Sequence, residues 1–122
     1  MQTGSFKDLL VWQKSVELAK EMYSLTKDLP SQEMFGLTSQ MRRAAVSIPS
    51  NIAEGHSRHS TPDYISFISI AIGSLAEVDT QVILAQDIEY VTAQDCAIVD
   101  DSIQRLQQML HKLRSSLKAK QQ

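Results

Sequence analysis

Apolar residues recur at helical spacing in four long segments of this sequence. The first segment covers residues 6–28 and the second covers residues 32–57. The third begins at Thr61 and the fourth at Thr92, and the connections between the segments are short. Apolar positions three and four residues apart are typical of a helix that buries one face. The pattern therefore predicts an all-α, up-down-up-down antiparallel four-helix bundle.

Local signals mark where these helices are expected to begin. Two pairs of residues have the spacing of a capping box, namely Ser5 with Asp8 and Thr92 with Asp95. Ser31 is the expected N-cap of the second helix, and Thr61 that of the third, because a proline follows it. Pro49 lies inside the second segment and lacks a backbone donor. We therefore expect a kink or a local irregularity there, but not a full break.

The composition fits one globular domain that covers residues 1–122. Hydrophobic residues make up 43% and charged residues 21% of the chain, while 4 Gly and 3 Pro are too few for a sandwich or barrel with many turns. We find no signal peptide and no run of about 18 apolar residues, so we expect no membrane span. The one cysteine, Cys96, excludes an internal disulfide and fits a cytoplasmic location.

The motifs of several enzyme classes are missing. There is no G-x-x-x-x-G-K, G-x-G-x-x-G, H-E-x-x-H or G-x-S-x-G, and no Glu is followed three residues later by His, as a di-iron bundle requires. His56 and His59 lie near Glu54 and Asp63, but a solvated loop explains them better than a metal site without fixed ligand geometry. We therefore expect a non-enzymatic protein with no cofactor and no metal.

A polar stripe on the second helix has two readings. Ser47, Asn51 and Glu54 follow one another at spacings of four and three residues, beside the apolar pair Ile48 and Ile52. The stripe either faces solvent or forms a hydrogen-bonded network at a contact between helices or subunits. Asn and Glu in such contacts fix register and partner choice, because leaving them unpaired costs free energy. We favour the second reading and expect these five residues to lie at an interface.

Charge is unevenly distributed, although the formal net charge is only −2. Residues 61–90 contain five acids and no Lys or Arg, whereas residues 102–122 contain five Lys or Arg and no acid. The basic last helix can pair with the acidic third helix, within the bundle or between subunits, or it can contact phosphates. On the second helix, the adjacent Arg42 and Arg43 can pair with Glu54 or with an acid of the third helix.

Three stretches resemble a known family. They are FKDLLVWQKSVELAKEMY (6–23), FGLTSQMRRAAVSIPSNIAEG (35–55) and IAIGSLAEVDTQ (70–81). The chain resembles the four-helix bundle proteins encoded within intervening sequences of bacterial 23S rRNA genes. The resemblance implies assembly as a barrel-like homopentamer. It also implies similarity to the accessory variability protein of diversity-generating retroelements, a basic pentamer that works with a reverse transcriptase and its RNA; the pI of this chain, about 5.9, is lower.

These observations lead to two hypotheses from different classes. The first is a non-enzymatic, 23S rRNA-associated oligomer that binds structured RNA or a ribonucleoprotein through several phosphate contacts. The alternative is a scaffold that recruits a partner enzyme and binds no nucleic acid. A third reading, a metal- or small-molecule-binding bundle, needs inward-facing ligands that we do not find. For the first hypothesis, the expected contact residues are Arg42, Arg43, Arg58, Arg105, Lys112, Arg114, Lys118 and Lys120.

Overall fold

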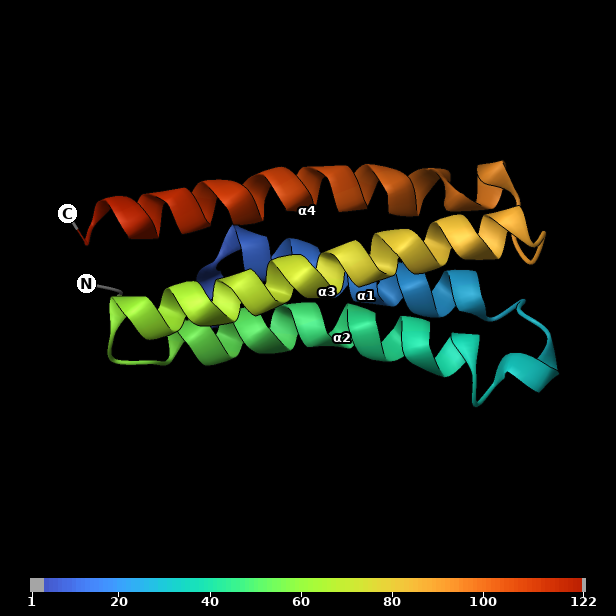
Figure 1. The fold of residues 1–122 in the computed structure, drawn as a ribbon, viewed down its shortest axis with the longest axis horizontal. Coiled ribbons are helices and arrows are strands. Elements are labelled where there is room, and N and C mark those ends of the chain that lie inside the picture. Colours follow the sequence, from blue (N-terminus) through green and yellow to red (C-terminus); the bar gives the residue numbers. More distant parts are fainter. Residues whose placement is uncertain (1–3, 122) are drawn as a thin grey trace.

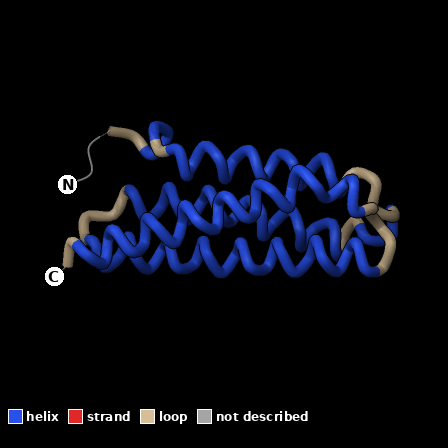
Figure 2. Tube along the Cα trace, turned by 90° about the horizontal axis from the view of Figure 1, so that it is seen from above, coloured by secondary structure: helices blue, strands red, loops and turns tan. Residues whose placement is uncertain are grey.

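The computed structural model describes residues 4–121 and folds them into helices (Figure 1). Within that span lie four α-helices and two short 3-10 helices, with no β-strand. The α-helices are α1 (Leu10–Thr26), α2 (Leu37–His56), α3 (Thr61–Asp87) and α4 (Ala93–Ala119), and the 3-10 helices are η1 (Phe6–Asp8) and η2 (Ser31–Glu33). Figure 2 shows the connections gathered at the two ends of the helices. The predicted all-α class is confirmed.

The four α-helices share one apolar core. α1 packs against α2 and α4, and α3 packs against the same two helices. The largest fully buried side chains come from all four, including Leu18, Ile48, Ile68 and Leu110. Each such side chain contributes about 1.5–3 kcal/mol relative to an exposed position. Burial of the predicted apolar rows is therefore what holds the helices together.

α3 and α4 begin close to where the sequence predicts. Thr92 caps α4 with a full capping box, because its hydroxyl accepts from the backbone N–H of Asp95 and the Asp95 carboxylate accepts from that of Thr92. The expected N-cap of α3 is wrong by one residue. Ser60, not Thr61, has the extended backbone and accepts from the N–H of Asp63, which places Pro62 in the first turn.

α1 and α2 begin later than the periodicity predicts. Ser5 caps only the short helix η1, and the extended backbone of Leu9 separates η1 from α1. This break lets the ring of Phe6 pack edge-on against that of Trp12, with ring centroids 5.2 Å apart. Ser31 likewise begins η2 rather than α2. The helix boundaries expected at residues 6 and 32 are thus corrected to 10 and 37.

Gly36 sets the actual start of α2. A Cβ at this position would lie 2.8 Å from Glu33 Oε1. That oxygen accepts a hydrogen bond of 3.2 Å from the backbone N–H of Leu37, the first residue of α2. A residue without a side chain therefore lets Glu33 reach and cap the helix. Further along, α2 continues through Pro49 without a full break, as the sequence predicts.

α3 ends in a Schellman motif. The N–H of Glu89 bonds to the carbonyl of Gln86, and the N–H of Tyr90 bonds to that of Ala85. Glu89 has φ 64°, the left-handed conformation that this motif requires. Length and composition alone would allow α3 to cross a membrane. A helix that buries one face in a protein core can pass the same test, and α3 buries one apolar row against α2 and α4.

Candidate nucleic-acid interface

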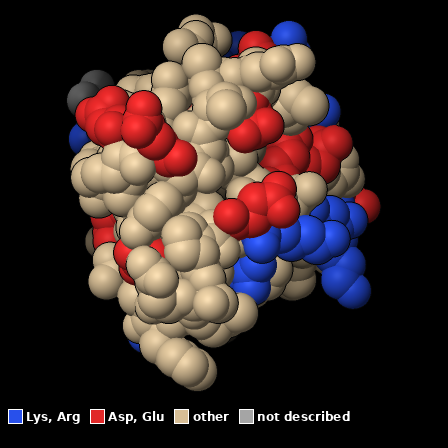
Figure 3. Space-filling model, turned by 90° about the vertical axis from the view of Figure 1, so that its right-hand side faces the viewer, with Lys and Arg blue, Asp and Glu red and all other residues tan. Residues whose placement is uncertain are grey.

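The two ends of the molecule differ in charge. The N-terminal segment, the connection between α2 and α3, and the end of α4 lie together at the left of Figure 1. We call this the basic end, defined as residues 4–8, 54–64 and 112–121, which contain six Lys or Arg and three Asp or Glu. The opposite end, residues 27–36 and 86–95, contains one Lys and five Asp or Glu. Figure 3 faces that end, the acidic end, where acidic side chains are spread across the surface and one group of Lys and Arg side chains lies to the side.

Helix polarity favours cations at the basic end. α4 finishes there, and its last turns carry Lys112, Arg114, Lys118 and Lys120. Unsatisfied carbonyl groups make a helix C-terminus partly negative, which stabilises nearby cations. Lysine and arginine in the last turns of α4 therefore stabilise the helix end and are also the residue types that bind phosphate.

Arg42 contributes mainly to packing between α1 and α2. Its Nε donates to Thr26 Oγ1 at 2.9 Å, and its guanidinium lies 4.6 Å from the ring centroid of Tyr23. The side chain is half-buried. Neighbouring Arg43 is exposed. The structure thus separates two arginines that are adjacent in sequence, and only Arg43 extends into solvent.

Three more of the eight predicted RNA contacts have partners within the chain. Arg58 forms an ion pair with Glu54 at 3.1 Å and lies over the ring of Phe67. Arg105 pairs with Asp101 at 2.9 Å on the exposed face of α4. Arg114 of α4 donates a hydrogen bond to Ser69 Oγ of α3 at 3.2 Å. Exposed ion pairs contribute little to stability, typically less than about 1 kcal/mol, so Glu54 and Asp101 hold the guanidinium groups of Arg58 and Arg105 only weakly.

The remaining predicted cations are available for contact. Lys112, Lys118 and Lys120 are exposed, and within residues 4–121 they have no ion-pair partner. Together with Arg43 they are the residues that can approach a phosphate without breaking an internal contact. Three of the four lie at the basic end.

The three residues of the polar stripe on α2 have different surroundings: Ser47 and Asn51 contact α3 through a hydrogen-bonded network, whereas Glu54 does not. Ser47 Oγ and Ser74 Oγ of α3 share a hydrogen bond of 2.8 Å, and Asn51 Nδ2 donates to Ser47 Oγ at 2.9 Å. Ser74 is buried, so this network lies in the contact between α2 and α3. Glu54 instead lies exposed and pairs with Arg58, while Ile48 and Ile52 are fully buried. Sequence reasoning missed Ser74, which stands in an apolar segment without a motif.

A second polar contact, also missed, closes the acidic end. Tyr90 OH donates to Glu33 Oε2 at 2.8 Å, which joins the α3–α4 connection to the segment before α2. This hydrogen bond, with the backbone N–H of Leu37, lowers the pKa of Glu33 below its ordinary value of 4.5. The same hydrogen bond raises the pKa of Tyr90 above 10.0. Both shifts mean that the folded state favours ionised Glu33 with neutral Tyr90.

This contact predicts a pH-dependent stability difference between the wild type and Tyr90→Phe. Because Glu33 has a lower pKa when folded, its contribution is present above pH 4.5 and is lost as pH falls through the folded pKa. Tyr90→Phe is therefore expected to lower Tm at neutral pH, and the difference is expected to shrink on acidification. Thermal unfolding followed by circular dichroism at neutral pH and at about pH 3 measures this, with Tyr23→Phe as a control. An unchanged difference across this range would show that Glu33 does not carry the effect.

Two kinds of site can be checked directly among the described residues: clusters of metal ligands and the thiol of Cys96. Among residues 4–121, no three His, Cys, Asp or Glu side chains come together in a way that holds a metal ion. Cys96 is fully buried in α4, and burial raises the pKa of its thiol, with the charges of Asp100 and Asp95 adding to the effect. A neutral, buried thiol is a poor nucleophile.

Comparison with models of known protein families shows which family the chain belongs to. The model of the 23S rRNA-intervening sequence protein family matches residues 7–112. The chain belongs to this family. The match covers α1, α2, α3 and most of α4, and it confirms the resemblance carried by the three sequence stretches. Lys118 and Lys120 lie beyond the matched residues, so any role for them is argued from this chain alone.

A solved structure has a similar fold. It is the crystal structure of a protein with unknown function from the S23 ribosomal protein family of Bacteroides thetaiotaomicron. The two chains are 24% identical and superpose with a TM-score of 0.77, over 86% of this chain and 98% of the other. At this identity the likeness concerns the fold alone. No curated protein matches the chain.

Proposed function

We propose that this protein is a non-enzymatic, cytoplasmic RNA-binding oligomer that associates with 23S rRNA or another structured RNA. In this proposal the helices form an up-down-up-down antiparallel bundle, and five copies assemble as a homopentamer. The observation that carries the RNA proposal is the group of exposed lysines where α4 ends, Lys112, Lys118 and Lys120. Lysine ammonium groups that neutralise phosphates release counterions, which drives binding to nucleic acid. The family's association with 23S rRNA genes gives structured RNA as the first candidate.

Exposed apolar residues on α3 support self-association. Ile70, Ile83 and Leu84 are 51%, 55% and 47% exposed, although α3 already buries a full apolar row against α2 and α4. Covering these residues with another copy would remove apolar surface from water. Assembly would also repeat the basic end several times. Several weak phosphate contacts on one oligomer bind together far more tightly than each does alone.

The alternative is a scaffold that recruits a partner protein and binds no nucleic acid. The same apolar residues of α3 favour it, since an exposed apolar surface fits a protein partner as well as another copy. The two functions differ in what the lysines of α4 do. In the scaffold, their positive charges only stabilise the partly negative C-terminal end of α4.

Binding of fluorescently labelled 23S rRNA fragments separates the two functions. Anisotropy measures binding by the purified protein, and light scattering on the same sample measures its oligomeric state. The proposal predicts that an oligomer binds the RNA at low salt. An intact oligomer that does not bind at low salt would contradict the RNA function and support the scaffold, whose partner a pull-down would then identify.

A further inference from the structure

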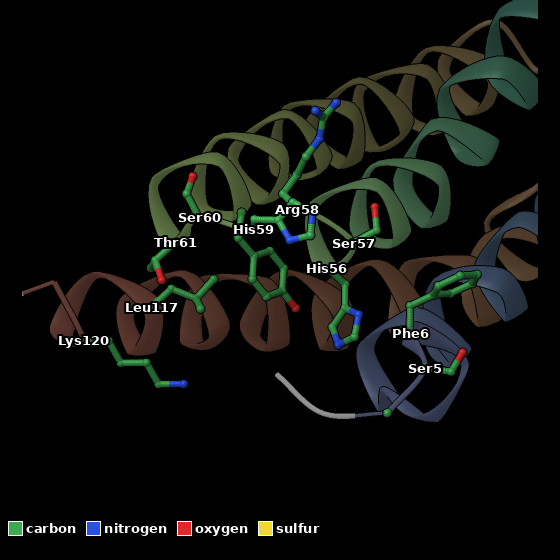
Figure 4. A pocket seen from close by; sticks show the side chains of 12 residues that line it. Ser5, Phe6, His56, Ser57, Arg58, His59, Ser60, Thr61, Leu117 and Lys120 are labelled. Atoms are coloured by element: carbon green, nitrogen blue, oxygen red, sulfur yellow. The ribbon is translucent and has the colours of Figure 1, made fainter. Parts of the chain in front are cut away.

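The basic end presents cations on a helix. Lys112 and Lys120, at the C-terminal end of α4, are exposed and lie about 12 Å apart along the helix axis. Figure 4 shows the side chain of Lys120 directed away from the α4 ribbon, beside a pocket that the α2–α3 connection and the N-terminal segment also line. The helix fixes the backbone positions of these cations, which suits an array of phosphates that is also held in place.

No Phe, Tyr or Trp ring among the described residues of the basic end is free to stack on a base. Phe6 is partly buried and packs edge-on with Trp12. Tyr64 is only 4% exposed. Phe67, one turn further along α3, lies under the guanidinium of Arg58, 4.9 Å from its ring centroid. Proteins that bind single strands stack the bases on aromatic side chains, and this end does not offer such a surface.

The other aromatic residues lie toward the acidic end. The sequence has one Trp, three Tyr and three Phe, and all of them fall within residues 4–121. Tyr90 and Tyr23 have partners within the chain, a carboxylate and a guanidinium respectively. Phe35 is 96% exposed, but the five Asp or Glu of the acidic end repel phosphate around it. The exposed ring and the free lysines therefore lie at opposite ends, whereas a single-strand site needs both together.

On the basis of the RNA function proposed above, we propose that the basic end binds the phosphate backbone of double-helical RNA in preference to single strands. Neutralising one phosphate of a double helix releases about 0.9 counterion, against about 0.7 for a single strand. A site without a free Phe, Tyr or Trp ring gains no stacking that would offset this difference. Double-helical RNA is recognised through its shape and backbone, so binding depends little on base sequence.

A short RNA duplex and one of its strands, chosen to be free of internal pairing, test this preference. Anisotropy measures the affinity of the purified protein for each, and light scattering measures its oligomeric state. With three lysine contacts, the duplex is expected to bind at least about fivefold more tightly at about 50 mM salt, and log K is expected to fall about 1.3 times as steeply with log salt concentration. A duplex has twice the phosphates of one strand, so a preference of about twofold or less counts as none.

The results separate failure of this preference from failure of the RNA function. Equal affinities, or tighter binding of the single strand, would overturn the preference for double helices and leave the RNA function in place. An intact oligomer that binds neither RNA at low salt would overturn both.

The double variant Phe35→Ala with His59→Ala tests whether exposed rings contribute. Both side chains are exposed, and their rings have no aromatic or guanidinium partner among the described residues. If the site binds the backbone of a double helix, the ratio of duplex to single-strand affinity stays within about twofold of the wild-type ratio. Circular dichroism checks that the variant is folded. A loss of single-strand affinity alone would show that bases stack on these rings, against the proposal.

Discussion

Reversing two lysines of α4, Lys112→Glu together with Lys118→Glu, will weaken binding to structured RNA by at least about thirtyfold near physiological salt. Each phosphate contact contributes about fivefold under these conditions through counterion release, so losing two contacts weakens binding about twenty-five-fold, and repulsion by the two new carboxylates adds to this. Both side chains are exposed and have no ion-pair partner within the described residues, so the fold should tolerate the change. Lys120 is left unchanged, so one cation stays at the C-terminal end of α4. Anisotropy with labelled 23S rRNA fragments measures the effect.

The control carries the same change of charge elsewhere. Lys20→Glu with Lys27→Glu alters two exposed lysines of α1 and the connection after it, away from the basic end. A general loss of positive charge would weaken RNA binding equally in both double variants. A specific interface on α4 predicts a much smaller loss in the control. If the control loses as much affinity as the α4 variant, the interface is wrongly placed.

The second large effect concerns two glycines that respond in opposite directions. A Cβ at Gly55 would lie 2.8 Å from Phe67 Cβ and 3.0 Å from Tyr64 Cδ1, where α2 meets α3. Gly55→Ala is therefore expected to lower the free energy of unfolding by about 1–3 kcal/mol, because α2 and α3 must move apart. At Gly73 no atom lies within 4 Å of such a Cβ. Gly73→Ala is expected to raise the free energy of unfolding by up to about 1 kcal/mol, because alanine has a higher helix propensity than glycine.

Thermal and urea unfolding of both variants at one protein concentration measures this pair. The concentration is fixed because assembly shifts apparent stability. For a domain of this size, each 1 kcal/mol corresponds to a change of roughly 2–8 °C in Tm. Equal Tm values for the two variants would contradict the close packing of α2 on α3 at Gly55.

The sequence predicts the features that are encoded within a single segment of the chain. The apolar rows of α3 and α4 and the capping box of Thr92 are visible within single segments, and the structure contains them. The starts of α1 and α2 were predicted too early, because contacts that the pattern does not encode decide them. Phe6 packs on Trp12, and Glu33 reaches the start of α2 over Gly36.

Candidate sites were harder to predict, since they join distant segments. The excess of cations in residues 102–122 was visible in the sequence, but which of them have internal partners was not. Arg42, for example, donates to Thr26 of α1, a residue 16 positions away in sequence. A pocket at the basic end is likewise lined by Tyr64 of α3 and by Leu117 and Lys120 of α4. Such neighbours follow from the packing of helices and have no local signal.

The dependence of RNA affinity on salt tests the central claim most directly. Wild-type protein and labelled 23S rRNA fragments are titrated by anisotropy across a series of salt concentrations, and log K is plotted against log salt concentration. If the basic end of an oligomer binds RNA through several phosphates, log K falls steeply, with a slope of magnitude about 3 or more. A flat plot, or no binding at low salt by an intact oligomer, would contradict the account.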